Sequence, residues 1–134
     1  MNVNVVPYQS RHVESLFAMM REEGEEWSDY YQGSGVDAFI GALRDSVTWV
    51  AVDRDAVVGF IRCREDSGFG VFVYDLLVAK SHRGASLGQT LIEHVCDRSK
   101  GQPVYVLSDA DDYYIKLGAE PVGTIFRLDT RLDL

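Results

Sequence analysis

The chain has 134 residues and a mass of 15.0 kDa, which is the size of one domain. Its 46% apolar and 25% charged residues are typical of soluble proteins and exclude a collagen-like, disordered or disulfide-dense chain. A net charge of −8 without a basic run argues against nucleic-acid binding, and no apolar stretch has the ~20 residues that a membrane helix needs. We expect one cytoplasmic domain over residues 1–134, with no nucleic-acid or membrane partner.

The two cysteines, Cys63 and Cys96, have no second cysteine or histidine at metal-ligand spacing nearby. Both lie in apolar-patterned segments, where a free cysteine behaves as a small hydrophobic residue. We therefore expect two buried free thiols and no metal site.

Hydrophobic periodicity predicts the elements of the first half of the chain. Residues 2–6 alternate polar and apolar side chains and predict a short strand that ends at Pro7. Apolar residues at helical spacing predict a helix from Ser10 to Gly24 and a second, short helix over residues 36–43. Three strands then follow with only turns between them, over residues 47–52, 56–64 and 69–78.

The second half alternates helices and strands. Leu87, Leu91 and Val95 share one face of a helix predicted from about Ser86 to Arg98. A strand over 104–107, a short helix over 111–117 and a last strand over 122–128 follow. Consecutive strands favour an antiparallel meander, and a helix between two strands favours a parallel crossover. The order predicts a mixed α/β (α+β) fold, with a mainly antiparallel, six- to seven-stranded sheet flanked by about four helices.

The segment before the third predicted helix has the features of an anion site. No carboxylate occurs from Leu76 to Ile92, although Lys80, His82 and Arg83 lie there. Small residues at the start of a helix let a phosphate approach the unpaired first amides, and an arginine can grip its oxygens. A simple turn with glycines for packing explains the same composition equally well. The nucleotide P-loop and dinucleotide fingerprints are both absent.

Two segments resemble the GNAT superfamily of N-acetyltransferases. Asp75 to Arg83 followed by Gly84-Ala-Ser-Leu-Gly88 is similar to the family's acyl-CoA signature after a strand, and Tyr113 to Ala119 is similar to its F-Y-x-K-x-G-F segment. The predicted element order agrees with the family over nearly the whole chain. The chain departs from the pattern where Ser86 replaces a glycine, Lys80 a proline and Ala119 an aromatic residue. Leu107 or Ser108 stands where the family often has an asparagine.

The resemblance implies a GNAT-like fold and an N-acetyltransferase that moves an acetyl group from acetyl-CoA, as co-substrate, to a primary amine by direct transfer in a ternary complex, without a metal. In the family the cofactor arm lies where two strands of the sheet splay apart. The implied cofactor-binding residues offer backbone groups to the pantetheine or hold the pyrophosphate: Leu76, Leu77, Val78, Arg83, Gly84, Ala85, Ser86, Leu87, Gly88 and Gln89.

Two implied catalytic residues each have a structural alternative. Tyr114 matches the family's general acid, which would protonate the departing thiolate. It could instead be a half-buried aromatic residue, with Tyr113 as the donor. Asp75 is the candidate for receiving or orienting the amine, because an unpaired carboxylate is costly to bury in an apolar strand. A structural aspartate that pairs with a neighbouring group is an equal alternative.

The acidic and aromatic segment between the first two helices borders the acceptor site in the family. Carboxylates and aromatic faces together suit a cationic amine, and a solvated loop is the alternative. The candidate acceptor-binding residues are Glu26, Trp27, Tyr30 and Tyr31, with Glu22, Glu23, Glu25 and Asp29 nearby.

Other classes of function stay open at this stage. The substituted glycine and missing asparagine are also compatible with a non-catalytic acyl-CoA-binding sensor or scaffold. An α/β interaction protein without a cofactor is a third alternative. We expect the acceptor to be a small-molecule or protein amine, and a homodimer stays open.

Overall fold

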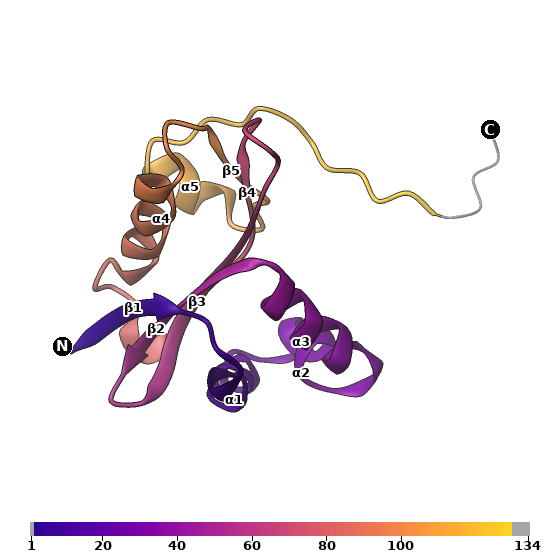
Figure 1. The fold of residues 1–134 in the computed structure, drawn as a ribbon, viewed down its shortest axis with the longest axis vertical. Coiled ribbons are helices and arrows are strands. Elements are labelled where there is room, and N and C mark those ends of the chain that lie inside the picture. Colours follow the sequence, from indigo (N-terminus) through magenta and orange to yellow (C-terminus); the bar gives the residue numbers. More distant parts are fainter. Residues whose placement is uncertain (1, 130–134) are drawn as a thin grey trace.

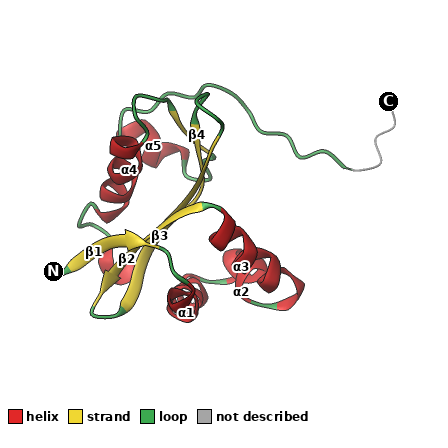
Figure 2. Ribbon diagram, in the orientation of Figure 1, coloured by secondary structure: helices red, strands yellow, loops and turns green. Residues whose placement is uncertain are grey.

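The computed structural model describes residues 2–129 and contains one five-stranded sheet with the order β1-β2-β3-β4-β5 (Figures 1 and 2). Neighbouring strands are antiparallel from β1 to β4, and β5 runs parallel to β4. The bounds are β1 Val3–Pro7, β2 Val47–Asp53, β3 Ala56–Glu65, β4 Val71–Val78 and β5 Val104–Val106. The predicted meander and parallel crossover are therefore confirmed.

Helices cover both faces of this sheet. α1, α2 and α3 lie on one side, and α4 and α5 lie on the other (Figure 1). Their bounds are α1 Val13–Glu23, α2 Ser28–Tyr31, α3 Val36–Asp45, α4 Leu87–Arg98 and α5 Asp111–Lys116. The four-residue α2 was not predicted, because it is too short to show a hydrophobic period. None of these helices is long and apolar enough to cross a membrane.

β3 lies at the centre of the core and is buried on both faces from Val57 to Ile61. Phe60 faces the first helix layer, where its ring meets that of Phe39 edge-on at a centroid distance of 6.4 Å. Gly59 faces α4, and a Cβ there would lie 3.3 Å from the Leu91 side chain. The glycine therefore lets α4 approach the sheet closely, which sets the position of the helix.

The predicted sixth strand is wrong. Residues 117–129 form no helix or strand, and the chain leaves α5 and runs away from the body (Figures 1 and 2). A strand needs a partner for its backbone groups, and within residues 2–129 this segment pairs with none. The described sheet thus has five strands in place of six or seven, while the mixed fold class is confirmed.

The two thiols differ in their surroundings. Cys63 is 2% exposed on β3, and burial raises its pKa to about 11. Cys96 is exposed, because it lies one position beyond Val95 on α4 and outside the stripe that faces the sheet. The expected burial is therefore confirmed for the first cysteine and wrong for the second.

Candidate active site

β4 parts from β5 halfway along its length. Val71 to Val73 pair with Val104 to Val106, and the Leu107 amide donates to the Val73 carbonyl at 3.0 Å. β5 ends there, whereas β4 continues to Val78, and within the described part of the chain only β3 lies beside this second half. The second half of β4 therefore presents one backbone edge to an opening in the sheet.

The alternation of the strand decides which backbone groups face this opening. The Ala79 amide donates to Val58 of β3 at 2.9 Å, and a Cβ on Gly59 would lie 3.3 Å from the Leu77 carbonyl oxygen. Leu77 and Ala79 thus direct their backbone groups toward β3, and Leu76 and Val78 direct theirs toward the opening. Of the three strand residues proposed to bind the cofactor, Leu77 does not offer its backbone to this side.

The loop that opens α4 presents unpaired amides. Gly84 and Ser86 both have left-handed backbones, with φ of +86° and +60°. The first intrahelical bond joins the Thr90 amide to the Ser86 carbonyl at 3.0 Å. The amides of residues 87–89 therefore have no carbonyl partner within the helix, and they stand at its positive end. This arrangement fits a phosphate group.

Two of the three basic side chains of this loop have carboxylate partners. Arg83 lies 2.6 Å from Glu23 of α1, and its Nε donates to the Val78 carbonyl. His82 Nε2 lies 2.8 Å from an Asp53 carboxylate oxygen. The stretch from Leu76 to Ile92 thus has no carboxylate of its own, but Glu23 of α1 and Asp53 of β2 lie beside its basic side chains. A phosphate at this loop must share the Arg83 guanidinium with Glu23.

α5 places two tyrosines beside the start of α4. A Cβ on Gly88 would lie 2.5 Å from the Tyr113 hydroxyl oxygen, so a larger residue at position 88 would displace the tyrosine ring. Tyr114 is half-buried, and its ring meets that of Tyr113 edge-on at 5.2 Å. Burial, with smaller contributions from Tyr113 and Asp109, raises the pKa of Tyr114 to about 12. The Tyr114 phenol therefore keeps its proton at neutral pH.

Asp75 is paired with an arginine that the sequence analysis missed. Its carboxylate accepts a 2.6 Å hydrogen bond from Arg62 Nε, and both side chains are largely buried. The guanidinium also donates to Ser46 Oγ and lies over the rings of Phe39 and Tyr74. A bulge sets this pairing, because β4 has one extra residue between Val73 and Asp75. The direct contacts of Asp75 in this structure are thus those of a structural aspartate that is paired with a neighbouring side chain.

The aromatic part of the predicted acceptor segment packs onto the core. Tyr30 meets Trp27 at 5.5 Å and Phe39 at 4.7 Å. Burial first, and then the negative charge of Asp75, raise the pKa of Tyr30. The negative charge of Asp109 makes a small contribution in the same direction to the pKa of Tyr30 and of Tyr114. Tyr30 therefore packs on Phe39, the ring over which the guanidinium of Arg62 lies.

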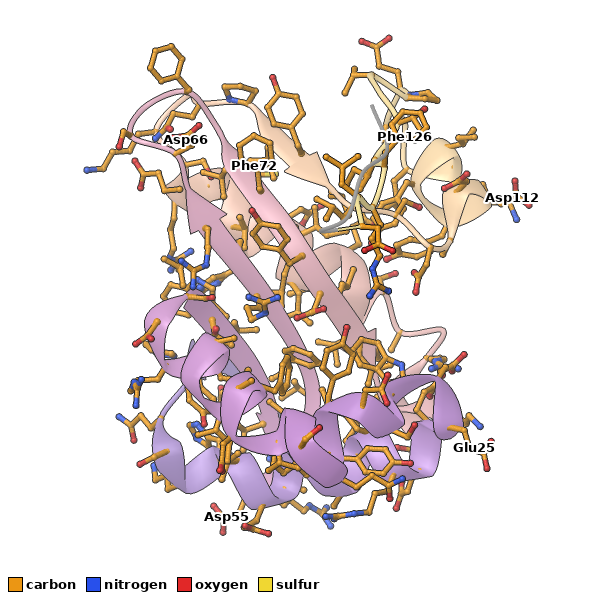
Figure 3. All side chains as sticks on the ribbon, turned by 90° about the vertical axis from the view of Figure 1, so that its right-hand side faces the viewer. Glu25, Asp55, Asp66, Phe72, Asp112 and Phe126 are labelled. Atoms are coloured by element: carbon orange, nitrogen blue, oxygen red, sulfur yellow. The ribbon has the colours of Figure 1, made fainter. Side chains whose placement is uncertain are left out.

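The other acceptor candidates lie farther out. Glu26 is exposed, and Tyr31 lies under Arg21 at 5.6 Å from its ring centroid. Glu25 is also at the outer surface beside α2 (Figure 3). These carboxylates can therefore act on an incoming ligand through their charge, but they do not contact the Asp75–Arg62 pair in this structure.

Sequence reasoning missed Arg62 and Asp109. The signal for Arg62 was a charge between the apolar residues Ile61 and Cys63, because a charged side chain there needs a partner on a neighbouring strand. Asp109 lies in an acidic turn after β5, which has no residue pattern that predicts its direction.

A cavity of about 510 Å³ lies apart from these catalytic candidates. α1, the β2–β3 hairpin and the loop after β4 form its walls, which include Asp53, Ser81 and His82. The cavity borders the loop between β4 and α4 (residues 79–86, the anion loop) through Ser81 and His82. It contains neither Tyr114 nor Asp75. Within residues 2–129, no cluster of histidine, cysteine and acidic side chains could hold a metal ion.

The fold is that of known acetyltransferases. It matches a GNAT family acetyltransferase of Streptococcus pneumoniae with a TM-score of 0.75 and 21% identity over 96% of this chain and 99% of that one. An aminoglycoside acetyltransferase from an uncultured soil metagenomic sample gives 0.72 and 22% over 98% and 100%. A Trypanosoma brucei acetyltransferase gives 0.72 and 26% over 96% and 99%.

The family follows from the sequence itself. The model of the Acetyltransferase (GNAT) family matches residues 14–124, which is most of the chain. The chain therefore belongs to the GNAT family of acetyltransferases, and the resemblance found in its motifs is confirmed. A search of curated proteins gave no match.

Proposed function

We propose that this acetyltransferase transfers the acetyl group of acetyl-CoA to the nitrogen of a primary amine, in a complex that holds both substrates at once. The observation that carries the proposal is the continuity of the site. The open edge of β4 leads to the unpaired amides at the start of α4. The Tyr113 hydroxyl of α5 lies beside these amides, and Tyr114 is its half-buried neighbour.

The chain's own groups fit acetyl-CoA along this path. The amides of Leu87, Gly88 and Gln89 would hold the pyrophosphate, while Gly84 and Ala85 leave room for its approach. Arg83 would bind it from the side by sharing its guanidinium with Glu23. The backbone groups of Leu76 and the Val78 amide would bind the pantetheine arm, as a β-strand would.

Acetyl-CoA supplies an activated thioester carbonyl to this site. An amide on the open edge of β4 would polarise that carbonyl by donating to its oxygen. As the N–C bond forms and the C–S bond breaks, Tyr114 would give its proton to the departing sulfur. The attacking nitrogen must be neutral, and the proton that it loses as the amide forms would pass through water to the Tyr114 phenolate, which restores the phenol. Asp75, held by Arg62, would orient the amine, directly or through water.

Acidic side chains favour a positively charged acceptor. Asp109, Glu25 and Glu26 are exposed, and the rings of Trp27 and Tyr30, 5.5 Å apart, are half-buried in the same segment as the two glutamates. Carboxylates attract a cationic amine, and aromatic faces bind one. The net charge of −8 adds to this attraction.

The experiment is a mass-shift screen of amines with acetyl-CoA, followed by rates for Tyr114→Phe and Tyr113→Phe. We expect a gain of one acetyl group on cationic amines. Turnover should fall by about 10²-fold in Tyr114→Phe, since a general acid contributes at least that much. Tyr113→Phe is the matched control and should keep most of the rate. Acetyl-CoA binding by calorimetry should be similar in all three proteins.

Other outcomes would overturn this proposal. Binding of acetyl-CoA without turnover on any amine would support the non-catalytic sensor or scaffold. Modification of neutral or acidic acceptors only would contradict the preference for cations. If Tyr113→Phe lost the rate and Tyr114→Phe kept it, the proton donor would be Tyr113.

A further inference from the structure

A hydrogen-bonded series of serine, histidine and aspartate lies on the wall of the cavity that the acetyltransferase candidates do not use. Ser81 Oγ lies 2.8 Å from His82 Nδ1, and His82 Nε2 lies 2.8 Å from Asp53 Oδ2. All three residues line the cavity of about 510 Å³. A base that touches a nucleophile and is itself oriented by a third group is the arrangement of nucleophilic catalysis.

The two partners of the histidine ring determine where its hydrogen lies. A carboxylate only accepts hydrogen bonds, so the Nε2 that faces Asp53 carries the hydrogen. In the neutral ring Nδ1 is then the acceptor, and the Ser81 hydroxyl donates to it. The side chains of His82 and Asp53 are largely buried, whereas Ser81 is exposed. The hydroxyl is therefore open to a substrate, while its base is held in place.

The β2–β3 turn adds a cation to the same cavity. Arg54 and Asp55 both have left-handed backbones, with φ of +52° and +69°, although neither is a glycine. Strained backbone of this kind is concentrated at functional sites. Arg54 lines the cavity, and within residues 2–129 it has no carboxylate partner. A guanidinium there can bind the negative oxygen that forms when a serine attacks a carbonyl group.

The rest of the cavity indicates which substrate fits. A volume of about 510 Å³ is within the range of small-molecule sites. Its apolar lining suits a short acyl chain, and the Glu22 carboxylate on α1 favours a neutral ester over an acid. The apolar residues are Ala18, Met19, Val57, Val58 and Ala79.

We propose that Ser81, His82 and Arg54 form a second catalytic site, positioned by Asp53, that hydrolyses carboxylic esters with a short apolar acyl chain. Ser81 Oγ bonds to the ester carbonyl carbon while its proton moves to His82 Nδ1. The C–O bond to the alcohol then breaks, and the alcohol leaves with that proton. Water, which gives a proton to the same nitrogen, releases the acid and restores the serine. This inference does not rest on the proposed function.

The proposed ester site lies apart from the tyrosines of α5. Figure 3 shows Asp55 of the β2–β3 turn at the opposite end of the molecule from Asp112 of α5. The hydrolysis of an ester also needs no acetyl-CoA. The two activities can therefore be measured separately, and either can fail without the other.

The first test is covalent labelling of the full chain with an alkyl fluorophosphonate. This probe reacts with an activated serine, because an O–P bond forms and fluoride leaves. We expect one label, on the peptide that contains Ser81. His82→Gln should slow the labelling by about 10²-fold, because the hydroxyl loses its base. Ser34 is an exposed serine between α2 and α3, and it is the internal control that should stay unlabelled.

The second test is the hydrolysis of 4-nitrophenyl butyrate. Turnover should fall by about 10²-fold in Ser81→Ala, while Ser34→Ala keeps the parent rate. Asp53→Asn should lower kcat and leave KM similar, because Asp53 orients the base and does not touch the ester. Arg54→Gln should also lower kcat, since the negative oxygen loses a donor. Circular dichroism should show that all variants keep their fold.

Three results would overturn the ester site. An unlabelled Ser81, or labelling that His82→Gln does not slow, would show that the hydroxyl is not activated. Hydrolysis at the parent rate in Ser81→Ala would assign the reaction to another nucleophile, such as the exposed Cys96, and Cys96→Ser would then lose it. Hydrolysis by the parent protein no faster than by free imidazole at equal concentration would show that the cavity does not catalyse it.

Discussion

The two strands that flank β4 differ in almost every respect. β3 has 10 residues, is paired along its length and is buried on both faces, whereas β5 has 3 residues that are only half-buried. The β3 side holds the fold together through core packing. On the β5 side, backbone groups of both β4 and β5 have no strand partner among residues 2–129, and these are groups that a ligand or another strand can use.

The same contrast appears in the charged groups. On the β3 side, Arg62 and Asp75 are buried and satisfied by each other and by Ser46. On the β5 side, Asp109 and Asp111 are exposed, and α5 contacts the start of α4 through Tyr113. A stable half and an open half within one sheet would let the protein bind its substrates without a loss of stability.

The largest expected effect is on core packing. Phe60→Ala removes a fully buried ring of β3 and should lower the free energy of unfolding by about 3–5 kcal/mol. Tyr105→Ala removes a half-buried ring of β5 that stacks on Phe72 at 5.1 Å, and should cost about 1 kcal/mol. Urea titrations of the two variants measure both values. Equal losses of stability in the two variants would show that β3 and β5 contribute equally to the fold.

The buried ion pair should come next. Arg62→Met leaves the Asp75 carboxylate buried without its cation, which should cost about 3 kcal/mol of stability. Arg44→Met is the matched control, since Arg44 pairs with Asp45 at the surface with 72% and 58% of the side chains exposed. Loss of that solvent-exposed pair should leave the stability nearly unchanged. Similar values in denaturant unfolding would show that Asp75 is solvated in solution.

Ser86→Gly tests the role of the left-handed backbone in the anion loop before α4. Glycine adopts the left-handed backbone of this position without the cost that a side chain adds, so stability should rise by about 0.5–1 kcal/mol. Acetyl-CoA should bind a few-fold more tightly, because the first amides become more accessible. Ser81→Gly serves as the control, since its φ is not positive, and it should give neither gain. Thermal unfolding and calorimetry measure the two effects.

The smallest expected effect is a pH dependence from His12. Its ring is 5% exposed and accepts the Gln9 amide through Nδ1, and burial lowers its pKa. Below about pH 6.5 the unfolded chain binds a proton that the folded chain resists. The stability that this residue contributes is thus complete above that pH and is lost as the pH falls.

His12→Asn tests this assignment, because asparagine keeps an acceptor for the Gln9 amide and does not titrate. The loss of thermal stability between pH 7 and pH 5 should be smaller in this variant than in the parent protein. Identical pH profiles would assign the effect to other groups, such as His94, whose pKa is also lowered by burial.

Local patterns predicted most of the fold because they act over a few residues. The sequence predicted elements close to those observed from the apolar stripe of α4, the apolar runs of β2 and β3, and the small residues before α4. The anion loop could be predicted for the same reason, since a strand, small residues and a helix follow one another directly in the chain.

Long-range pairing could not be predicted in this way. The Arg62–Asp75 contact depends on a bulge that shifts the register of β3 against β4 by one residue. The partners of Arg83 and His82 come from α1 and β2, which are distant in sequence. The segment over 122–128 has the local pattern of a strand, but whether it pairs depends on a neighbour that its own sequence does not specify.

The most direct test is an amide NMR titration of the protein with acetyl-CoA. If the open edge of β4 and the start of α4 form the site, the largest shifts will fall on Leu76, Val78 and residues 87–89. Shifts confined to the cavity between α1 and His82, or no binding at millimolar concentration, would contradict the account.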